Sequence, residues 1–488
     1  MPTEDTLRLS ATELSRRIAG RELSCVALME ATLARIDALN PAHNAIVSPA
    51  DADTCMAQAR ERDAQLARGE RMGWMHGFPI AVKDLSDAAG FATSRGSPLA
   101  PKSPARSDFP QVARMRASGA IVIGKTNTPE FGLGSHTYNT VFGTTRNAWD
   151  TRKSAGGSSG GAAVALALGM LPVADGSDMM GSLRNPAAFN NVIGLRPSRG
   201  RVPGPPGDEL FFQQLGTEGP MGRTVEDTAR LLCVQAGYDA HAPLSLPDAL
   251  PSADALVLGA DVRGKRIGWL GSIWPDLPLE AGVHEVCEAA LRTFGDIGCR
   301  VAPCTLDVPR EQNWQAWLRL RQLLVGGKLA ALDANPALRE KIKPEARWEI
   351  EQSHRLNAAS LYEASVYRSN VYRAFVQLFE RFDFVVAPTA QVFPFDAQLH
   401  WPDAVAGVKS DTYHRWMEIV TPFTLAGLPT LNLRAGFGAG GLPMGIQLAG
   451  PVNADLDVLR VGHAYDLACP WSAMHPPAAG RCAGRMDA

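Results

Sequence analysis

Two serine-bearing glycine turns are the residues of this chain best suited to chemistry. The first turn reads Gly-Gly-Ser-Ser-Gly-Gly over residues 156–161, and the second, Gly-Ser-Asp-Met-Met-Gly-Ser over 176–182, ends at Ser182. Glycine lets the backbone approach a bound group closely. Consecutive N–H groups in a tight turn stabilise the oxyanion of a tetrahedral intermediate by roughly 3–4 kcal/mol per donor. A serine hydroxyl in such a turn is a candidate nucleophile, so the two turns predict acyl transfer.

A serine nucleophile needs a base, and these turns have no histidine beside them. The ten histidines are dispersed along the chain, which argues against a Ser-His-Asp hydrolase. A buried lysine can serve instead, because burial disfavours the ammonium form. Lys83 and Lys125 each follow a short apolar run, at the strand end where α/β proteins usually form their sites, whereas Lys153 lies among charged residues typical of a surface. Spacing alone does not separate Lys83 from Lys125.

Each serine turn also has a structural interpretation. Ser182 precedes Asn185-Pro186, a pair typical of a helix start, so its hydroxyl could simply cap that helix. The turn at 156–161 has the composition of a flexible linker. A linker explains this turn poorly, because an apolar helical segment follows it immediately. A loop packed against the second turn fits better.

A nucleotide-binding protein is a rival hypothesis from another class. Residues 119–126, Gly-Ala-Ile-Val-Ile-Gly-Lys-Thr, match the pattern of a phosphate-binding loop. The residues between the two glycines are apolar and mostly β-branched, which is typical of a strand, whereas a phosphate cradle needs exposed N–H groups. The nearest candidate magnesium ligand is Asp175, in a segment interrupted by Pro172. The sequence therefore favours a strand here.

The composition is typical of a soluble globular enzyme. The chain has 488 residues, 45% hydrophobic and 20% charged, with a formal net charge of -2. This charge gives no indication of a nucleic-acid partner, and the longest apolar run, 162–174, is too short to span a membrane. The first residues lack the apolar core of a signal peptide, so we expect a cytoplasmic location. Eight singly scattered cysteines without a C-x-x-C pair predict reduced thiols and no metal site.

Helical and strand patterns alternate along the chain and predict an α/β fold. Helical spacing occurs at 12–19, 24–39, 51–68, 107–118, 224–236, 281–295 and 361–381. Short apolar runs typical of buried strands occur at 78–82, 120–124, 192–197, 265–270, 382–388 and 430–437. Ser24 is expected to cap the second helix and Pro41 to end it. The alternation predicts helices around a large, mixed and mostly parallel sheet.

The domain organisation predicted from these patterns is simple. Residues 1–70 form a helical segment packed on the core, and residues 71–474 form a single α/β core. Within that core, the Trp- and Arg-rich stretch 308–360 is expected to form a helical cap over the sheet edge. Residues 475–488 have the composition of a frayed tail.

A series of ordered motifs resembles the amidase signature family, the serine amidases with a Ser-Ser-Lys triad. The motifs are GFPIAVKD (77–84), GKTNTPEFG (124–132), FGTTRNAWD (142–150), GGSSGG (156–161), GSDMMGSLRNPA (176–187), GLRPSRGRVP (194–203), GPMGRTVEDTA (219–229), AGLPTLNL (426–433) and GLPMGIQLAGP (441–451). They extend over most of the chain. The resemblance implies one α/β domain around a large twisted mixed sheet.

The resemblance also implies roles for individual residues. Lys83 matches the catalytic lysine, Ser158 the bridging serine that the family typically holds by a cis peptide bond, and Ser182 the nucleophile. The oxyanion hole then consists of the backbone N–H groups of Met179, Met180, Gly181 and Ser182. Ser159, Asp178 and Arg184 are interpreted as structural residues near the site. Neutral Lys83 takes a proton from Ser158, which takes one from Ser182, and the resulting acyl-enzyme chemistry needs no cofactor and no metal.

One residue departs from the family pattern. The family usually has Gly-Gly-Ser at the nucleophile, whereas this chain has Met180-Gly181-Ser182. A methionine that adopted a positive φ would strain the turn. The substitution therefore affects the expected geometry of the oxyanion hole and the substrate profile more than the reaction class.

The expected reaction is hydrolysis of a small-molecule amide, on a hydrophobic or aryl substrate. Esters and carbamates (urethanes) suit the same relay and are alternatives, and the glutaminase-like component of an amidotransferase is a weaker one. Apolar residues that could line a substrate pocket are Met180, Trp314, Trp317, Leu320, Trp416 and Phe423. Apolar residues at helical spacing more often belong to the core. A homodimer is expected only because such assemblies are common.

Overall fold

The computed structural model describes residues 4–480, which contain thirteen strands. The strands are β1 (Ile46–Val47), β2 (Pro79–Lys83), β3 (Ile121–Thr126), β4 (Val173–Asp178), β5 (Ile193–Arg196), β6 (Thr217–Gly222), β7 (Arg266–Trp269), β8 (Arg300–Pro303), β9 (Phe384–Pro388), β10 (Ala404–Val405), β11 (Val408–Lys409), β12 (Thr430–Phe437) and β13 (Pro443–Ala449). Each of the six apolar runs in the sequence overlaps one of these strands.

The described residues also contain fifteen α-helices. They are α1 (Glu4–Arg8), α2 (Ala11–Ala19), α3 (Cys25–His43), α4 (Ala52–Ala67), α5 (Pro110–Ala117), α6 (Gly160–Ala167), α7 (Arg184–Asn190), α8 (Val225–Gln235), α9 (Val283–Asp296), α10 (Arg310–Asp333), α11 (Pro336–Arg339), α12 (Pro344–Ser353), α13 (Ala358–Arg381), α14 (Thr421–Ala426) and α15 (Asp455–Ala468). None of them is both long enough and apolar enough to cross a membrane.

Helix α3 tests two local predictions from the sequence, its N-cap at Ser24 and its end at Pro41. The Ser24 hydroxyl accepts a hydrogen bond from the Ala27 N–H at 3.0 Å, so the predicted N-cap is confirmed. The prediction that Pro41 ends the helix is wrong, because the helix continues through it to His43. Asn44, at φ 52°, ends it instead. A proline removes one hydrogen bond within a helix, and here the last turn accommodates that loss.

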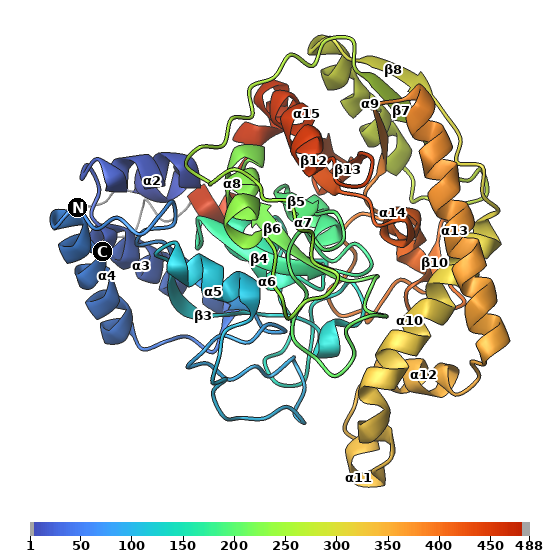
Figure 1. Cartoon of the computed structure of the whole chain (residues 1–488), viewed down its shortest axis with the longest axis horizontal. Coiled ribbons are helices and arrows are strands. Elements are labelled where there is room, and N and C mark those ends of the chain that lie inside the picture. The colour runs from blue at the N-terminus through green and yellow to red at the C-terminus, as the bar shows by residue number, and fades with distance from the viewer. Residues whose placement is uncertain (1–3, 481–488) are drawn as a thin grey trace.

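An eight-stranded mixed sheet, flanked by helices, forms the centre of the structure (Figure 1). Its order is β4-β6-β5-β12-β13-β9-β7-β8. The predicted α/β class with a large mixed sheet is confirmed, but the expectation of mostly parallel strands is wrong. Five of its pairings are antiparallel, and only the two among β9, β7 and β8 are parallel. A buried strand has the same apolar composition in either direction, so composition did not reveal the pairing.

A small three-stranded sheet, in the order β1-β3-β2, supplies the two candidate lysines. Lys83 is the last residue of β2, and Lys125 lies in the parallel neighbour β3. Strand β3, which carries Lys125, also contains most of the sequence that resembles a phosphate-binding loop. Every residue of this strand is buried. The preference for a strand over a phosphate cradle is therefore confirmed.

Two hydrophobic cores support these sheets. One combines the N-terminal helices with β2, β3 and the fully buried helix α6, and the other packs helices against the eight-stranded sheet. The stretch 308–360 is helical as expected. Helix α10 of this stretch packs against both α12 and α13, on the side of the molecule opposite α2–α4 (Figure 1).

The expected tail begins within the described residues. Residues Pro477–Gly480 form a short 3-10 helix, and Ala478 packs against the N-terminal core. The remainder of the predicted tail, 481–488, lies outside the described residues. The division of the chain into an N-terminal segment, a core and a tail stays a prediction.

We predict that Gly161→Ala lowers the free energy of unfolding by about 1–3 kcal/mol, the usual cost of overpacking. A Cβ atom at Gly161 in α6 would lie 2.4 Å from the backbone nitrogen of Asn127 and 2.5 Å from the carbonyl oxygen of Ala45. Urea denaturation followed by circular dichroism measures the effect. Gly440→Ala is the matched control, since its Cβ would meet no atom within 4 Å; equal stability of the two variants would contradict the prediction.

Candidate active site

The side chain of Lys83 lies at the meeting point of both serine turns. Its Nζ is 2.8 Å from the Oγ atoms of Ser158 and Ser159, and 3.0 Å from the Oγ of Ser177. Its backbone N–H donates to Asp175 Oδ1 at 3.0 Å, which fixes the end of β2 against β4. Lys83 is fully buried. The structure therefore places one lysine, held by its main chain and its side chain, among three hydroxyl groups.

The first serine turn connects this lysine to the second turn. The peptide bond between Gly157 and Ser158 is cis, as the family resemblance implied. Ser159, which directly precedes α6, donates its backbone N–H to the carbonyl oxygen of Ser182 at 3.2 Å. Ser182 retains 7% of its exposure, whereas Ser159 is completely buried. The two turns are packed together, as expected for a loop and not for a linker.

Lys125 has a different environment. Its Nζ donates to the carbonyl oxygen of Ser86, lies 3.3 Å from Thr93 Oγ1, and is 4.0 Å from Asp84 Oδ1. No serine of either turn is among these partners within the described residues. The geometry thus separates the two lysines that the spacing left as alternatives.

The second serine turn is fixed by the carboxylate of Asp178, the last residue of β4. Asp178 Oδ1 accepts the Gly181 N–H at 2.8 Å, and Oδ2 accepts the Leu183 N–H at 3.2 Å. Arg184 pairs with both oxygens at 3.0 Å. Ser182 lies between the two backbone donors, so the carboxylate sets the course of the chain on both sides of it.

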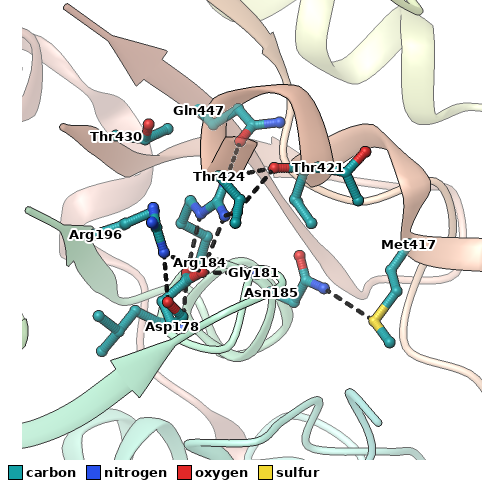
Figure 2. Close-up of polar contacts among 12 residues, drawn as sticks. Asp178, Gly181, Arg184, Asn185, Arg196, Met417, Thr421, Thr424, Thr430 and Gln447 are labelled. Atoms are coloured by element: carbon teal, nitrogen blue, oxygen red, sulfur yellow. Dashed lines mark hydrogen bonds and ion pairs between the residues drawn. The ribbon is translucent and has the colours of Figure 1, made fainter. Parts of the chain in front are cut away.

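Arg184 connects this turn to strand β13 and helix α14 (Figure 2). Its guanidinium donates to Gln447 Oε1 at 2.7 Å and to Thr424 Oγ1 at 3.1 Å, and Arg196 lies 3.4 Å from Asp178 Oδ1. Burial alone would raise the pKa of Asp178, but the two arginines hold that pKa well below its usual range. Asp178 therefore stays ionised, which fits its expected structural role.

The backbone N–H groups expected to form the oxyanion hole differ in their hydrogen bonding, and their role stays a prediction. The Gly181 N–H is already bound to Asp178 and is not free for a substrate. In the described part of the chain the N–H groups of Met179, Met180 and Ser182 donate to no acceptor. The positive φ of 76° falls on Gly181 and not on Met180, so the expected strain from methionine does not arise.

Burial changes the protonation of the groups around Lys83. It lowers the pKa of Lys83 to about 8, against the opposing effect of the carboxylates of Glu218, Asp175 and Asp178. It raises the pKa of Asp175 to about 6 and that of Glu218 to about 7. A lysine with this pKa exists partly as the free amine near neutral pH, the form that can accept a proton.

The aromatic residues proposed for the substrate pocket lie in the core. Trp314, Trp317, Trp416 and Phe423 are each at most 1% exposed. The Trp314 and Trp317 rings stack with their centroids 5.3 Å apart. Met180 is also buried in this core. This burial fits the structural interpretation of the rings, and a role in a substrate pocket stays a prediction.

Sequence reasoning missed three polar residues near Lys83. Ser177 precedes Asp178 and faces Lys83. Asp175 was considered only as a magnesium ligand, and Glu218 received no role. Both carboxylates lie on strands rich in glycine and polar residues, β4 and β6, which have no apolar run to reveal them. The Gly-Ser-Asp sequence of residues 176–178 was the feature of the sequence that could have indicated the polar residues of β4 near Lys83.

Comparisons with known proteins identify relatives over most of the chain. The family model named Amidase matches residues 27–459. An acylamidase of Rhodococcus erythropolis is 32% identical over 97% of this chain and 98% of its own length. One component of the glutamyl-tRNA(Gln) amidotransferase of Acidothermus cellulolyticus is 33% identical over 95% of each chain.

A solved structure extends this similarity to three dimensions. A bacterial aryl acylamidase described as an amidase signature enzyme superposes with a TM-score of 0.90 at 30% identity, covering 97% of this chain and 99% of its own. The chain therefore belongs to the amidase signature family and is an amidase, an enzyme that hydrolyses the C–N bond of carboxylic amides.

Proposed function

We propose that this amidase acts through a Ser182 acyl-enzyme, with Ser158 and Lys83 as the proton relay. The observation that carries the proposal is the 2.8 Å contact between the buried Lys83 Nζ and Ser158 Oγ. The pKa of Lys83, lowered by burial to about 8, supports a base that is neutral in part of the working range. The bond between the Ser159 N–H and the Ser182 carbonyl supports the proximity of the nucleophile.

In the proposed mechanism, Lys83 Nζ accepts the Ser158 hydroxyl proton while Ser158 Oγ accepts the proton of Ser182. Ser182 Oγ then attacks the amide carbonyl carbon, and the developing oxyanion binds the free N–H groups of the second turn. Collapse breaks the C–N bond, and the relay returns the proton to the leaving amine. Water attacks the acyl-enzyme by the same route and releases the carboxylic acid.

We propose an acyl amide, hydrophobic or aromatic, as the substrate class. The names of the acylamidase relative and of the aryl acylamidase structure support this choice. Esters and carbamates remain alternatives because the relay suits them equally. The amidotransferase relatives support a glutaminase activity as a further candidate. A panel of a nitroanilide, a nitrophenyl ester, an aryl carbamate and glutamine distinguishes these activities.

We expect a fluorophosphonate probe to form one covalent adduct, on Ser182. An activated serine attacks such probes, whereas an ordinary hydroxyl does not. Intact-protein mass spectrometry of the wild type and of Ser182→Ala detects the adduct, with the exposed Ser103→Ala as the control variant. An adduct that persists in Ser182→Ala would contradict the assignment of the nucleophile.

Removal of either relay residue should abolish turnover while the fold survives. Lys83→Ala and Ser158→Ala are each expected to lower kcat/KM for an aryl amide by roughly 10³-fold or more, since residues of one relay act as a unit. Circular dichroism checks folding, and Lys102→Ala, at an exposed lysine, is the control. Full activity in Lys83→Ala would reopen the assignment to Lys125.

The pH profile should follow the protonation of Lys83. Below its pKa of about 8 the lysine is an ammonium ion and accepts no proton, so kcat/KM for a nitroanilide should rise with pH through a midpoint near that value. Initial rates between pH 6 and pH 10 test this. A profile that falls over this range would contradict a lysine base.

A further inference from the structure

Glu218 is a carboxyl group close to the relay that the mechanism does not yet use. It lies in β6 directly opposite Ser177 of the antiparallel neighbour β4. Directly opposed residues point to the same face of a sheet, with Cβ atoms roughly 5 Å apart. Ser177 Oγ is 3.0 Å from Lys83 Nζ. The register therefore places the Glu218 side chain on the face of the sheet that Lys83 contacts.

The carboxyl group of Glu218 is short of partners. Its Oε2 atom is buried and, within the described part of the chain, accepts no hydrogen bond. The charged groups that act on it come from three elements, namely Lys83 of β2, Asp175 of β4 and Lys328 of α10. Glu218 as a whole is half-buried, and a buried carboxylate oxygen without a hydrogen-bond donor is costly unless a nearby positive charge compensates it. Among these groups, Lys83 has the largest effect on Glu218.

The other carboxylates near Lys83 are engaged elsewhere. Asp178 is paired with Arg184 and Arg196. Asp175 accepts the backbone N–H of Lys83, so its hydrogen bond fixes the main chain and not the ammonium group. Both also act on the Lys83 charge, but Glu218 has the largest effect of the three. Glu218 is thus the carboxylate best placed to respond to the charge on Nζ.

We propose that Glu218 is a positioning residue that acts through Lys83, stabilising the ammonium ion that forms when the relay delivers a proton to Nζ. This role rests on the proposed relay. In that step the Ser158 O–H bond breaks, a Lys83 N–H bond forms, and Glu218 remains a carboxylate throughout. The opposite charge makes the amine a stronger base at the moment of attack, in a place where water cannot solvate the new cation.

The proposal predicts a pH-dependent defect in Glu218→Gln. Loss of the carboxylate should lower the pKa of Lys83 by about one unit, a shift at the lower end of the range for a nearby opposite charge. Above pH 8 the wild type has its carboxylate and should react up to about tenfold faster than the variant, since one pKa unit corresponds to at most a tenfold change in the rate of proton transfer. Near pH 6 the Glu218 carboxyl is protonated, since its pKa is about 7, and the two proteins should react equally.

The rate of adduct formation between Ser182 and a fluorophosphonate, measured from pH 6 to pH 9, tests this without knowledge of the substrate. Wild type, Glu218→Gln, Glu218→Asp and Lys83→Ala are compared, with Glu288→Gln as the exposed carboxyl control. The wild-type to Glu218→Gln ratio should rise from about one at pH 6 to a value of up to about ten at pH 9. Glu218→Asp, which keeps the charge, should restore part of the difference.

The outcomes separate the two proposals. A wild-type to Glu218→Gln ratio that does not change with pH would overturn the role of Glu218 and leave the relay intact. Misfolding of Glu218→Gln would give this result, because it lowers the rate equally at every pH while Glu218→Asp reacts as the wild type. A Ser182 adduct that forms equally fast in Lys83→Ala would overturn the relay, and the role of Glu218 with it.

Discussion

The geometry of the second serine turn depends on one buried carboxylate, that of Asp178. Its oxygens bind the N–H groups of Gly181 and Leu183, on either side of Ser182, and pair with Arg184. Burying such an ion pair costs desolvation energy, which is offset only when the geometry is good and the remaining donors are satisfied. Arg184 meets this condition through bonds to β13 and α14. The loop is therefore fixed by segments far apart in the sequence.

Strand β4 connects this carboxylate to the environment of Lys83. Successive side chains of a strand point to opposite faces. Asp175 and Ser177 both contact Lys83, whereas Asp178 points to Arg184 on the other side. Strand β4 thus fixes the position of Lys83 relative to the second serine turn. A shift of its register by one residue would exchange the two faces and disrupt both sets of contacts.

The sequence predicted the elements whose signals are local. Apolar runs located β2, β3, β5, β7, β9 and β12, and the motifs indicated both serine turns. Strands β4 and β6 escaped detection because their glycine and polar residues serve the site and give no apolar run. The choice of Lys83 over Lys125 by geometry, and the position of Glu218, depend on which strands lie side by side. That information is tertiary and is not encoded in residue spacing.

The helical stretch 308–360 reaches the loop from outside the motifs. Arg321 Nη1 of α10 lies 3.3 Å from the sulfur of Met179, which is part of the second serine turn. Met179 also packs against a small apolar cluster formed with Phe131, Val325 and Leu329. Lys83 and Asp178 lie at the ends of strands β2 and β4, whereas these neighbours of Met179 come from helix α10 and from the short 3-10 helix Glu130–Gly132. Helix α10 thus contacts the second serine turn although it carries none of the motifs that indicate the site.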